Sequence, residues 1–321
     1  MTTKKVPIAD IDLENGQFNL SYLTDRGRLT ESIRQVGLLH PVVLRSADSQ
    51  GRCQIVSGFQ RIRSCIDLDM KYIDGIVHGR EELPDAKALL LTLHQTATSR
   101  EMNLIEKSLA LKRLSDTARI DDERLRTHIM PLLNLEPSEK VIRSVVGLWE
   151  LTDGVKAYIV QGGVTLGNAI RFLEFPLEDL DDLLELISPL RLNTNRLKEF
   201  LTLVIEICRR DDVSVREIID GETRDILADS DIPTPQKGER IRRRLRKRRF
   251  PQMAAVERDL QANVKRLKLP PRLSLRVPPY LEGERLKIEL TFEDVEELKS
   301  HIAQLSEISE KEELKAILEM L

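Results

Sequence analysis

The first part of the chain alternates short β-type runs with amphipathic helical segments. Residues 41–45 and 54–56 are rich in apolar and β-branched residues over lengths typical of strands. Residues 29–36 and 59–68 repeat apolar positions at helical spacing. The pattern predicts a small α/β or α+β module.

The middle of the chain is helical almost without interruption. Apolar residues recur at three- and four-residue spacing in residues 89–93, 103–118, 123–133, 138–151 and 155–161, and the pattern continues to about residue 219. We therefore predict an all-α domain.

The last part begins after a proline-containing polar stretch at residues 231–238. Eight of the ten residues 240–249 are Arg or Lys, so a basic linker is expected there. The segments beyond it predict a helix at 254–267, strands at 273–277 and 286–290 joined through Glu282 and Gly283, and a closing helix at 292–305.

These elements predict an α+β, mostly helical chain in several parts. A length of 321 residues allows two or three domains. With 41% hydrophobic but only 4% aromatic residues, the composition is typical of helix-rich proteins. The predicted parts are an α/β module (1–94), a helical domain (95–225), a basic linker (226–251) and a C-terminal helix, strand, strand, helix module (252–321).

Charge and cysteine content narrow the function classes. The net charge is −3, so any contact with nucleic acid must come from local basic patches. The three cysteines lack metal-ligand spacing, which favours reduced thiols. Neither a signal-peptide core nor a run of about 20 apolar residues is present. We expect a cytoplasmic protein without membrane insertion.

Several motifs resemble the ParB and sulfiredoxin superfamily. A strand ends at Ser57 and Gly58 and a helix begins immediately after them. The resemblance rests on residues 37–44 (GLLHPVVL), 55–66 (IVSGFQRIRSCI), 103–106 (NLIE), 141–151 and 155–170 (similar to that family's helix-turn-helix domain) and 286–298 (similar to its dimerisation domain). The resemblance covers nearly the whole chain and implies a ParB-like, DNA-associated protein.

The turn at Gly58 suits a phosphate group. Gly58 lets the backbone come close, the free amides at the helix start point outward, and Arg61 and Arg63 add positive charge. For an isolated Gly-x-x-Arg the alternative is a tight turn with surface arginines. With the resemblance, the nucleotide-binding candidates are Ser57, Gly58, Phe59, Gln60, Arg61, Arg63, Arg100 and Asn103, and the cofactor candidate is CTP with Mg²⁺.

The chain departs from the family at the residues that carry chemistry. Phe59 occupies the place of the sulfiredoxin catalytic cysteine, so reductase activity is not expected. Partition proteins have the motif Gly-Glu-Arg-Arg where this chain has Gly-Phe-Gln-Arg at residues 58–61. Gln95 and Thr96 stand in the place of the Glu-Asn pair that binds the metal ion in those proteins. We predict weak CTP binding with little hydrolysis, and assign neither catalytic nor metal-ligating residues.

A candidate DNA-reading helix lies in the central domain. Val141, Val145, Leu148 and Trp149 are predicted to form its buried face. Outward residues of such a helix contact base edges and phosphates. The candidates are Lys140, Arg143 and Ser144, opposed by Glu136 and Glu139.

The basic run offers a second candidate surface for DNA. Its candidate residues are Arg242, Arg243, Arg244, Arg246, Lys247, Arg248 and Arg249, which would bind phosphates strongly but without sequence preference. The alternatives are a solvated linker and intramolecular pairing with the acidic helix at residues 179–185.

The combined prediction is a homodimeric DNA-binding protein for DNA partition, plasmid maintenance or related regulation. Its expected partners are DNA, a second copy through residues 252–321, and a partition ATPase; its expected location is the bacterial nucleoid or a plasmid. Two alternatives stay open. One is a nuclease or kinase built on the first module, with only Asp67 and Asp69 near Gly58 in sequence. The other is an adaptor that has lost ligand binding.

Overall fold

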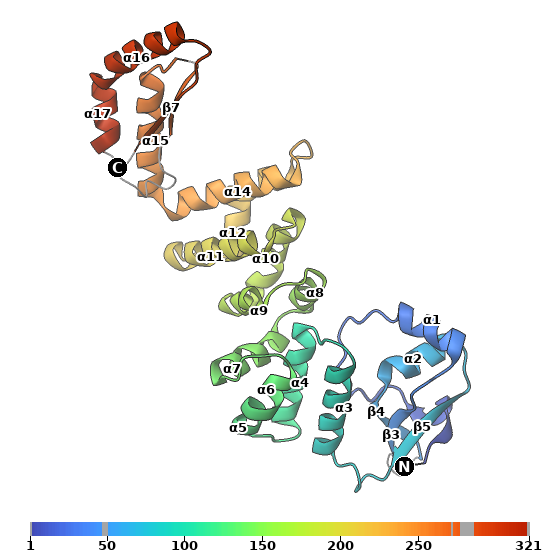
Figure 1. The fold of residues 1–321 in the computed structure, drawn as a ribbon. Helices are drawn as coiled ribbons and strands as arrows, with labels where there is room; N and C mark the ends of the chain where they lie inside the picture. Colours follow the sequence, from blue (N-terminus) through green and yellow to red (C-terminus); the bar gives the residue numbers. More distant parts are fainter. Residues whose placement is uncertain (1, 47–50, 271, 277–285, 320–321) are drawn as a thin grey trace.

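The computed structural model describes residues 2–46, 51–270, 272–276 and 286–319. The chain is elongated, with the N-terminal module at one end, helices in the middle and the C-terminal module at the other end (Figure 1). It is mostly helical with a mixed sheet in the N-terminal module, which confirms the predicted fold class. None of the described helices is long and apolar enough to cross a membrane.

A five-stranded mixed sheet forms the N-terminal module. The strands are β1 (Lys4–Pro7), β2 (Ile11–Asp12), β3 (Val42–Ser46), β4 (Cys53–Ser57) and β5 (Tyr72–His78), in the order β1-β5-β3-β4-β2. β3 pairs antiparallel with β4 and parallel with β5. Helices α1 (Gly27–Val36) and α2 (Phe59–Asp67) pack on each other, and the predicted strands and helices of this module are confirmed.

Helices build the middle of the chain. The longer ones are α3 (Asp85–Ser99), α4 (Leu104–Asp116), α7 (Glu139–Gly147), α8 (Asp153–Gln161), α10 (Leu180–Ile187) and α11 (Thr194–Asp211), with short turns of helix between them. Two hydrophobic cores meet at α4, because Leu109 and Leu111 belong to the core of the sheet module and Ile105 to the core of the later helices.

The segment predicted as a linker is a helix. α14 (Thr234–Arg249) buries Ile241 and Leu245 completely in the second core and packs against α11. These two residues are four positions apart and therefore lie on one helix face. The chain then bends at Phe250 into α15 (Pro251–Arg266).

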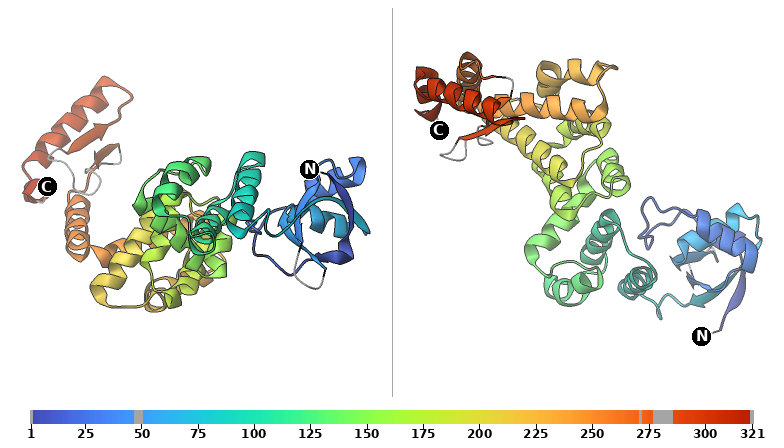
Figure 2. Two further views of the ribbon diagram at one scale, coloured as in Figure 1. Left: turned by 90° about the horizontal axis from the view of Figure 1, so that it is seen from below. Right: turned by 45° about the horizontal axis from the view of Figure 1, so that its top comes forward.

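The C-terminal module has a small core of its own. Strands β6 (Leu273–Arg276) and β7 (Lys287–Leu290) pair antiparallel, and α15 packs against α17 (Glu312–Glu319) (Figure 2). The closing helix α16 (Val295–Ser309) starts later than predicted, and α17 was not predicted. The predicted turn at Glu282 and Gly283 lies outside the described residues.

Candidate functional site

A pocket of about 330 Å³ lies at the turn between β4 and α2. One wall comes from the loop at residues 19–21 and another from the end of α3. Six of the eight predicted nucleotide-binding residues line it: Ser57, Gly58, Phe59, Gln60, Arg61 and Arg100.

Gly58 shapes the floor of this pocket. Its φ of +102° lies in the left-handed region that favours glycine. A Cβ atom at this position would lie 2.7 Å from Val42 Cγ1 and 3.1 Å from Arg61 Nη2. Helix α2, which starts at the next residue, has no side-chain cap at its N-terminus. The turn therefore lets a ligand come close to the first backbone amides of α2.

Arg61 is fixed beside Gly58. Its Nη1 donates hydrogen bonds to the carbonyl oxygens of His40 (2.9 Å) and Pro41 (2.8 Å). Burial lowers the pKa of Arg61, although a guanidinium stays protonated at neutral pH. Nη1 is thus engaged, while Nη2 lies 3.1 Å from the position that a Cβ atom at Gly58 would take.

Arg100 is held at the pocket edge by a buried carboxylate. Its two terminal nitrogens donate to Glu106 Oε2 (2.7 Å) and Oε1 (2.6 Å), and Glu106 is fully buried. The same carboxylate accepts from the backbone amides of Tyr22 (3.0 Å) and Asn103 (3.0 Å). The charge of Arg100 is therefore balanced, and this network orders the pocket wall.

Helix α4 also holds the loop that forms the opposite wall. Arg113 Nη1 donates to the carbonyl oxygens of Gly16 (2.9 Å), Gln17 (2.7 Å) and Asn19 (2.7 Å). The lining residues that the sequence did not indicate are Asn19, Leu20, Ser21, Leu29, His40, Thr92 and Ser99. The loop residues Asn19, Leu20 and Ser21 are held at the pocket by the hydrogen bonds from Arg113, which lies more than 90 residues later in the sequence. No local sequence pattern indicates such a contact.

Two predicted residues do not line the pocket. Arg63 is exposed on α2, because it lies two residues beyond Arg61 and points to another face of the helix. Asn103 instead caps α4 by accepting from the Glu106 amide, and its Nδ2 donates to Tyr22 O at 3.0 Å. It supports the network around Glu106 rather than contacting the pocket.

Gln95 and Thr96, which replace the family's metal-binding pair, do line the pocket. The Ser57 hydroxyl hydrogen-bonds Gln95 Oε1, and the Thr96 hydroxyl donates to Thr92 O at 2.8 Å. No Asp or Glu occurs among the described residues that line this pocket. The cavity therefore suits an anion and lacks the carboxylate ligands that a hard cation prefers.

The candidate DNA-reading helix α7 exposes Lys140 and Arg143, while Ser144 is half-buried. Its buried face consists of Ile142 and Val145 rather than the predicted Val141, which is half-buried. The helix packs on α4, which also forms part of the network around the pocket.

Most arginines of α14 form ion pairs within the chain. Arg242 contacts Glu199 (3.0 Å), Arg244 contacts Asp225 (2.6 Å), Arg248 contacts Asp211 (2.9 Å) and Arg249 contacts Glu206 (2.7 Å). The acidic helix at residues 179–185 is not their partner, because its Asp182 and Glu185 pair with Arg216.

Two further cations of the run, Arg243 and Lys247, face outward, whereas Arg246 is half-buried. Arg243 is 69% exposed and shares Glu239 with Arg242, and Lys247 is also exposed. Arg240, which was not among the predicted residues, lies on the same face at i, i+3 and i+7 spacing. Outward positive charge on α14 is thus concentrated on one stripe.

Comparison with known proteins agrees with the motifs. Residues 4–106 match the ParB N-terminal domain family. A probable chromosome-partitioning protein ParB of Pseudomonas putida is 24% identical over 141 residues, which cover 44% of this chain and 45% of that protein. The match thus spans less than half the length of this relative.

Solved structures of ParB from Caulobacter crescentus are also similar. The form complexed with CTP-gamma-S has 23% identity and a TM-score of 0.27, and covers 57% of this chain and 99% of that one. The form complexed to the centromeric parS site has 20% identity and a TM-score of 0.36, and covers 67% and 95%. By the family match, residues 4–106 are similar to the ParB N-terminal domain.

Proposed function

We propose that this chain is a DNA-binding partition protein that binds a cytidine triphosphate in the Gly58 pocket without hydrolysing it efficiently. The observation that carries the proposal is the pocket itself. Its Gly58 backbone, the uncapped start of α2 and the fixed Arg61 converge on one cavity. The family match over residues 4–106 and the relative's name as a chromosome-partitioning protein support it.

The pocket chemistry fits a polyphosphate. Backbone amides at a helix start and a guanidinium are donors that recognise phosphate oxygens. A volume of about 330 Å³ lies in the range of small-molecule sites. The Ser99 oxygen, as an acceptor, and the Asn19 Nδ2, as a donor, also line the pocket and would be available to the remainder of the nucleotide.

Hydrolysis is disfavoured by the same residues. A metal ion and a group that orients water are the usual sources of rate in phosphoryl transfer. The described lining residues include no carboxylate, so Mg²⁺ would enter mainly through the phosphates themselves. This also argues against a nuclease or kinase centred on this pocket.

Calorimetry with CTP and ATP, with and without Mg²⁺, tests the nucleotide proposal. We expect CTP binding that Gly58→Ala abolishes, since a Cβ would collide with Val42 and occupy the phosphate cradle. Arg63→Ala, at an exposed position on the same helix, is the matched control and should bind normally. Rapid turnover of CTP, or equal binding by the Gly58 variant, would contradict the proposal.

DNA would be contacted by α7 and by the outward stripe of α14. In this proposal Lys140 and Arg143 contact a preferred site, whereas Arg243 and Lys247 contact phosphates of any sequence. Arg242, Arg244, Arg248 and Arg249 contribute less than predicted from sequence, because intramolecular carboxylates already neutralise them.

Filter binding to random duplex DNA over a series of salt concentrations tells the cations of α7 from those of α14. Replacing Arg243 and Lys247 with Ser should reduce the logarithmic salt slope by about 0.9 per lost phosphate contact. Lys140→Ala with Arg143→Ala should leave random-duplex binding unchanged. Identical salt slopes for the Arg243 and Lys247 variant and the parent would show that these two side chains do not contact DNA.

Self-association through the C-terminal module belongs to the same proposal. Ile288 is 40% exposed, Val295 63% and Ile302 56%. Apolar surface on β7 and α16 is therefore exposed to solvent in the single chain. A second copy would cover this surface, as the two-stranded sheet is small. A monomeric mass of the full chain in analytical ultracentrifugation would contradict this part. A partition ATPase partner and a location on the nucleoid or a plasmid complete the proposal.

A further inference from the structure

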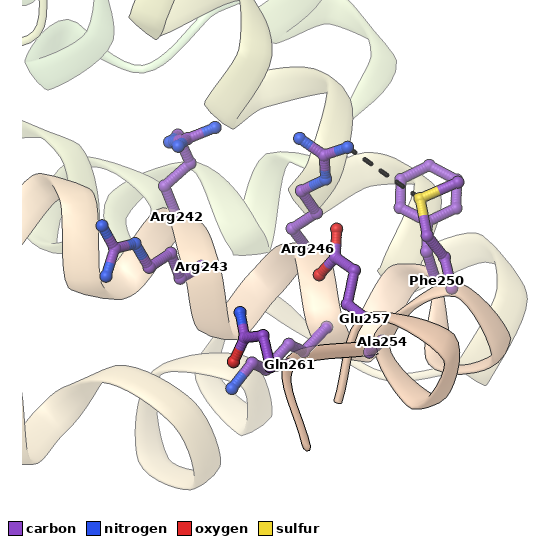
Figure 3. A pocket seen from close by; sticks show the side chains of 9 residues that line it. Arg242, Arg243, Arg246, Phe250, Ala254, Glu257 and Gln261 are labelled. Atoms are coloured by element: carbon purple, nitrogen blue, oxygen red, sulfur yellow. Dashed lines mark hydrogen bonds between the residues drawn. The ribbon is translucent and has the colours of Figure 1, made fainter. Parts of the chain in front are cut away.

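Helices α14 and α15 enclose a groove at the bend where the chain passes Phe250 (Figure 3). The groove has a volume of about 480 Å³. Arg243, Arg246 and Lys247 come from α14, and Met253 and Glu257 come from the first turns of α15. It lies far along the chain from the Gly58 pocket and shares no lining residue with it.

The groove carries an excess of positive charge. Four cations line it, Arg242 included, against the single carboxylate of Glu257. Arg242 is already paired with Glu199 and Glu239, and Arg243 shares Glu239. In the described part of the chain no ion pair involves Lys247. An incoming carboxylate would therefore be attracted to Lys247 and Arg243 without having to break the pairs that anchor α14 to α11.

Three apolar side chains also line the groove, those of Phe250, Met253 and Ala254. Phe250 is 37% exposed, and the Arg249 guanidinium lies 4.7 Å from its ring centroid. Met253 places its sulfur 4.0 Å from Arg246 Nη2, and Ala254 lies beside it. A methionine thioether is an adaptable contact for apolar side chains. A phosphate backbone gains nothing from such atoms, whereas an amphipathic peptide does.

We propose that this groove docks an acidic amphipathic helix of a partner protein. An apolar side chain of that helix lies against Phe250 and Met253, and its carboxylates pair with Arg243 and Lys247. The combination of basic and apolar lining residues is the complement of an acidic amphipathic helix. This inference goes beyond the proposed function, in which Arg243 and Lys247 contact DNA phosphates, so the partner helix and DNA would compete for these two side chains.

Fluorescence anisotropy of the full chain with a labelled probe peptide tests the proposal. The probe is a synthetic helix with Glu on one face and Leu on the other, and the control peptide replaces each Leu by Ser. Lys247→Glu and Met253→Ser should each weaken binding by about fivefold or more, since one removes a rim charge and the other an anchor contact. The control peptide without Leu should bind the unchanged protein as weakly as the probe peptide binds the Met253→Ser variant.

Arg240→Glu is the matched charge control. Arg240 is exposed on the same stripe as Arg243 and Lys247 but does not line the groove. We expect it to change peptide affinity by less than about twofold at moderate salt. Gln261→Glu, at an exposed position on the α15 side, adds a repelling charge without removing a contact and should weaken the peptide.

Two results would overturn the proposal. If Arg240→Glu weakens the peptide as much as Lys247→Glu while Met253→Ser has no effect, the attraction is general charge and not the groove. If short duplex DNA binds with the dependence predicted for the peptide, Met253 included, the groove is a nucleic-acid surface. Circular dichroism melts of each variant exclude unfolding as the cause.

Discussion

Replacement of Glu106 by Ala tests the network that orders the nucleotide pocket. The buried carboxylate accepts four hydrogen bonds, two from Arg100 and one each from the amides of Tyr22 and Asn103. Removing one partner of a buried ion pair costs about 3–5 kcal/mol, because the remaining charge loses its compensation. The Arg100 side chain is 36% exposed and regains part of its hydration, so we expect the lower end of that range, about 3 kcal/mol.

The measurement is urea unfolding followed by the fluorescence of Trp149, the only tryptophan of the chain. Its ring centroid lies 6.1 Å from that of Tyr22, so it reports on this region. Glu106→Gln keeps one acceptor oxygen and should cost less, about 1–2 kcal/mol. Glu81→Ala, at an exposed position, should leave the free energy of unfolding unchanged. A loss below about 1 kcal/mol for Glu106→Ala would refute the role assigned to this network.

Three further predictions concern other parts of the chain. Arg113→Met should raise the Kd for CTP in calorimetry, because the loop that forms one pocket wall loses its three hydrogen bonds; an unchanged Kd would contradict this. Hydrogen bonds from Arg242 lower the pKa of Glu239 from 4.5 to about 2, so its stabilising effect is complete above about pH 4.5 and is lost as the pH falls toward 2. Glu239→Gln should therefore flatten the fall in Tm over that interval, and a parallel curve would argue against the pairing. Burial, with a smaller effect from Asp179, raises the pKa of Cys208 to about 11. Its alkylation at about pH 8 should be much slower in the folded protein than in urea, and equal rates measured by mass spectrometry would exclude a protected thiol.

The local parts of the site could be predicted from the sequence. The strand at residues 54–56, the helix at 59–68 and the glycine between them follow from periodicity and from the special backbone that Gly58 adopts. The loop wall could not be predicted, since Arg113 reaches Asn19 through a contact that no local pattern encodes.

The basic run shows a different limit. Ile241 and Leu245 give the helical spacing that buries α14, yet the density of arginine around them favoured the interpretation as a linker. Charge counts in a sequence do not reveal which charges are neutralised. In this chain Arg242 and Arg249 each have a partner that lies 43 residues away, on α11.

The position of α4 between two cores has a consequence for unfolding. Leu109 and Leu111 stabilise the sheet module, while Ile105, one turn earlier on the same helix, stabilises the later helices. Neither core keeps its packing if this helix melts, so both should be lost in one cooperative transition. The C-terminal module, whose small core includes Leu260 and Ile308, is free to unfold separately. Calorimetry should accordingly resolve two units, with the boundary after α14 rather than after the sheet.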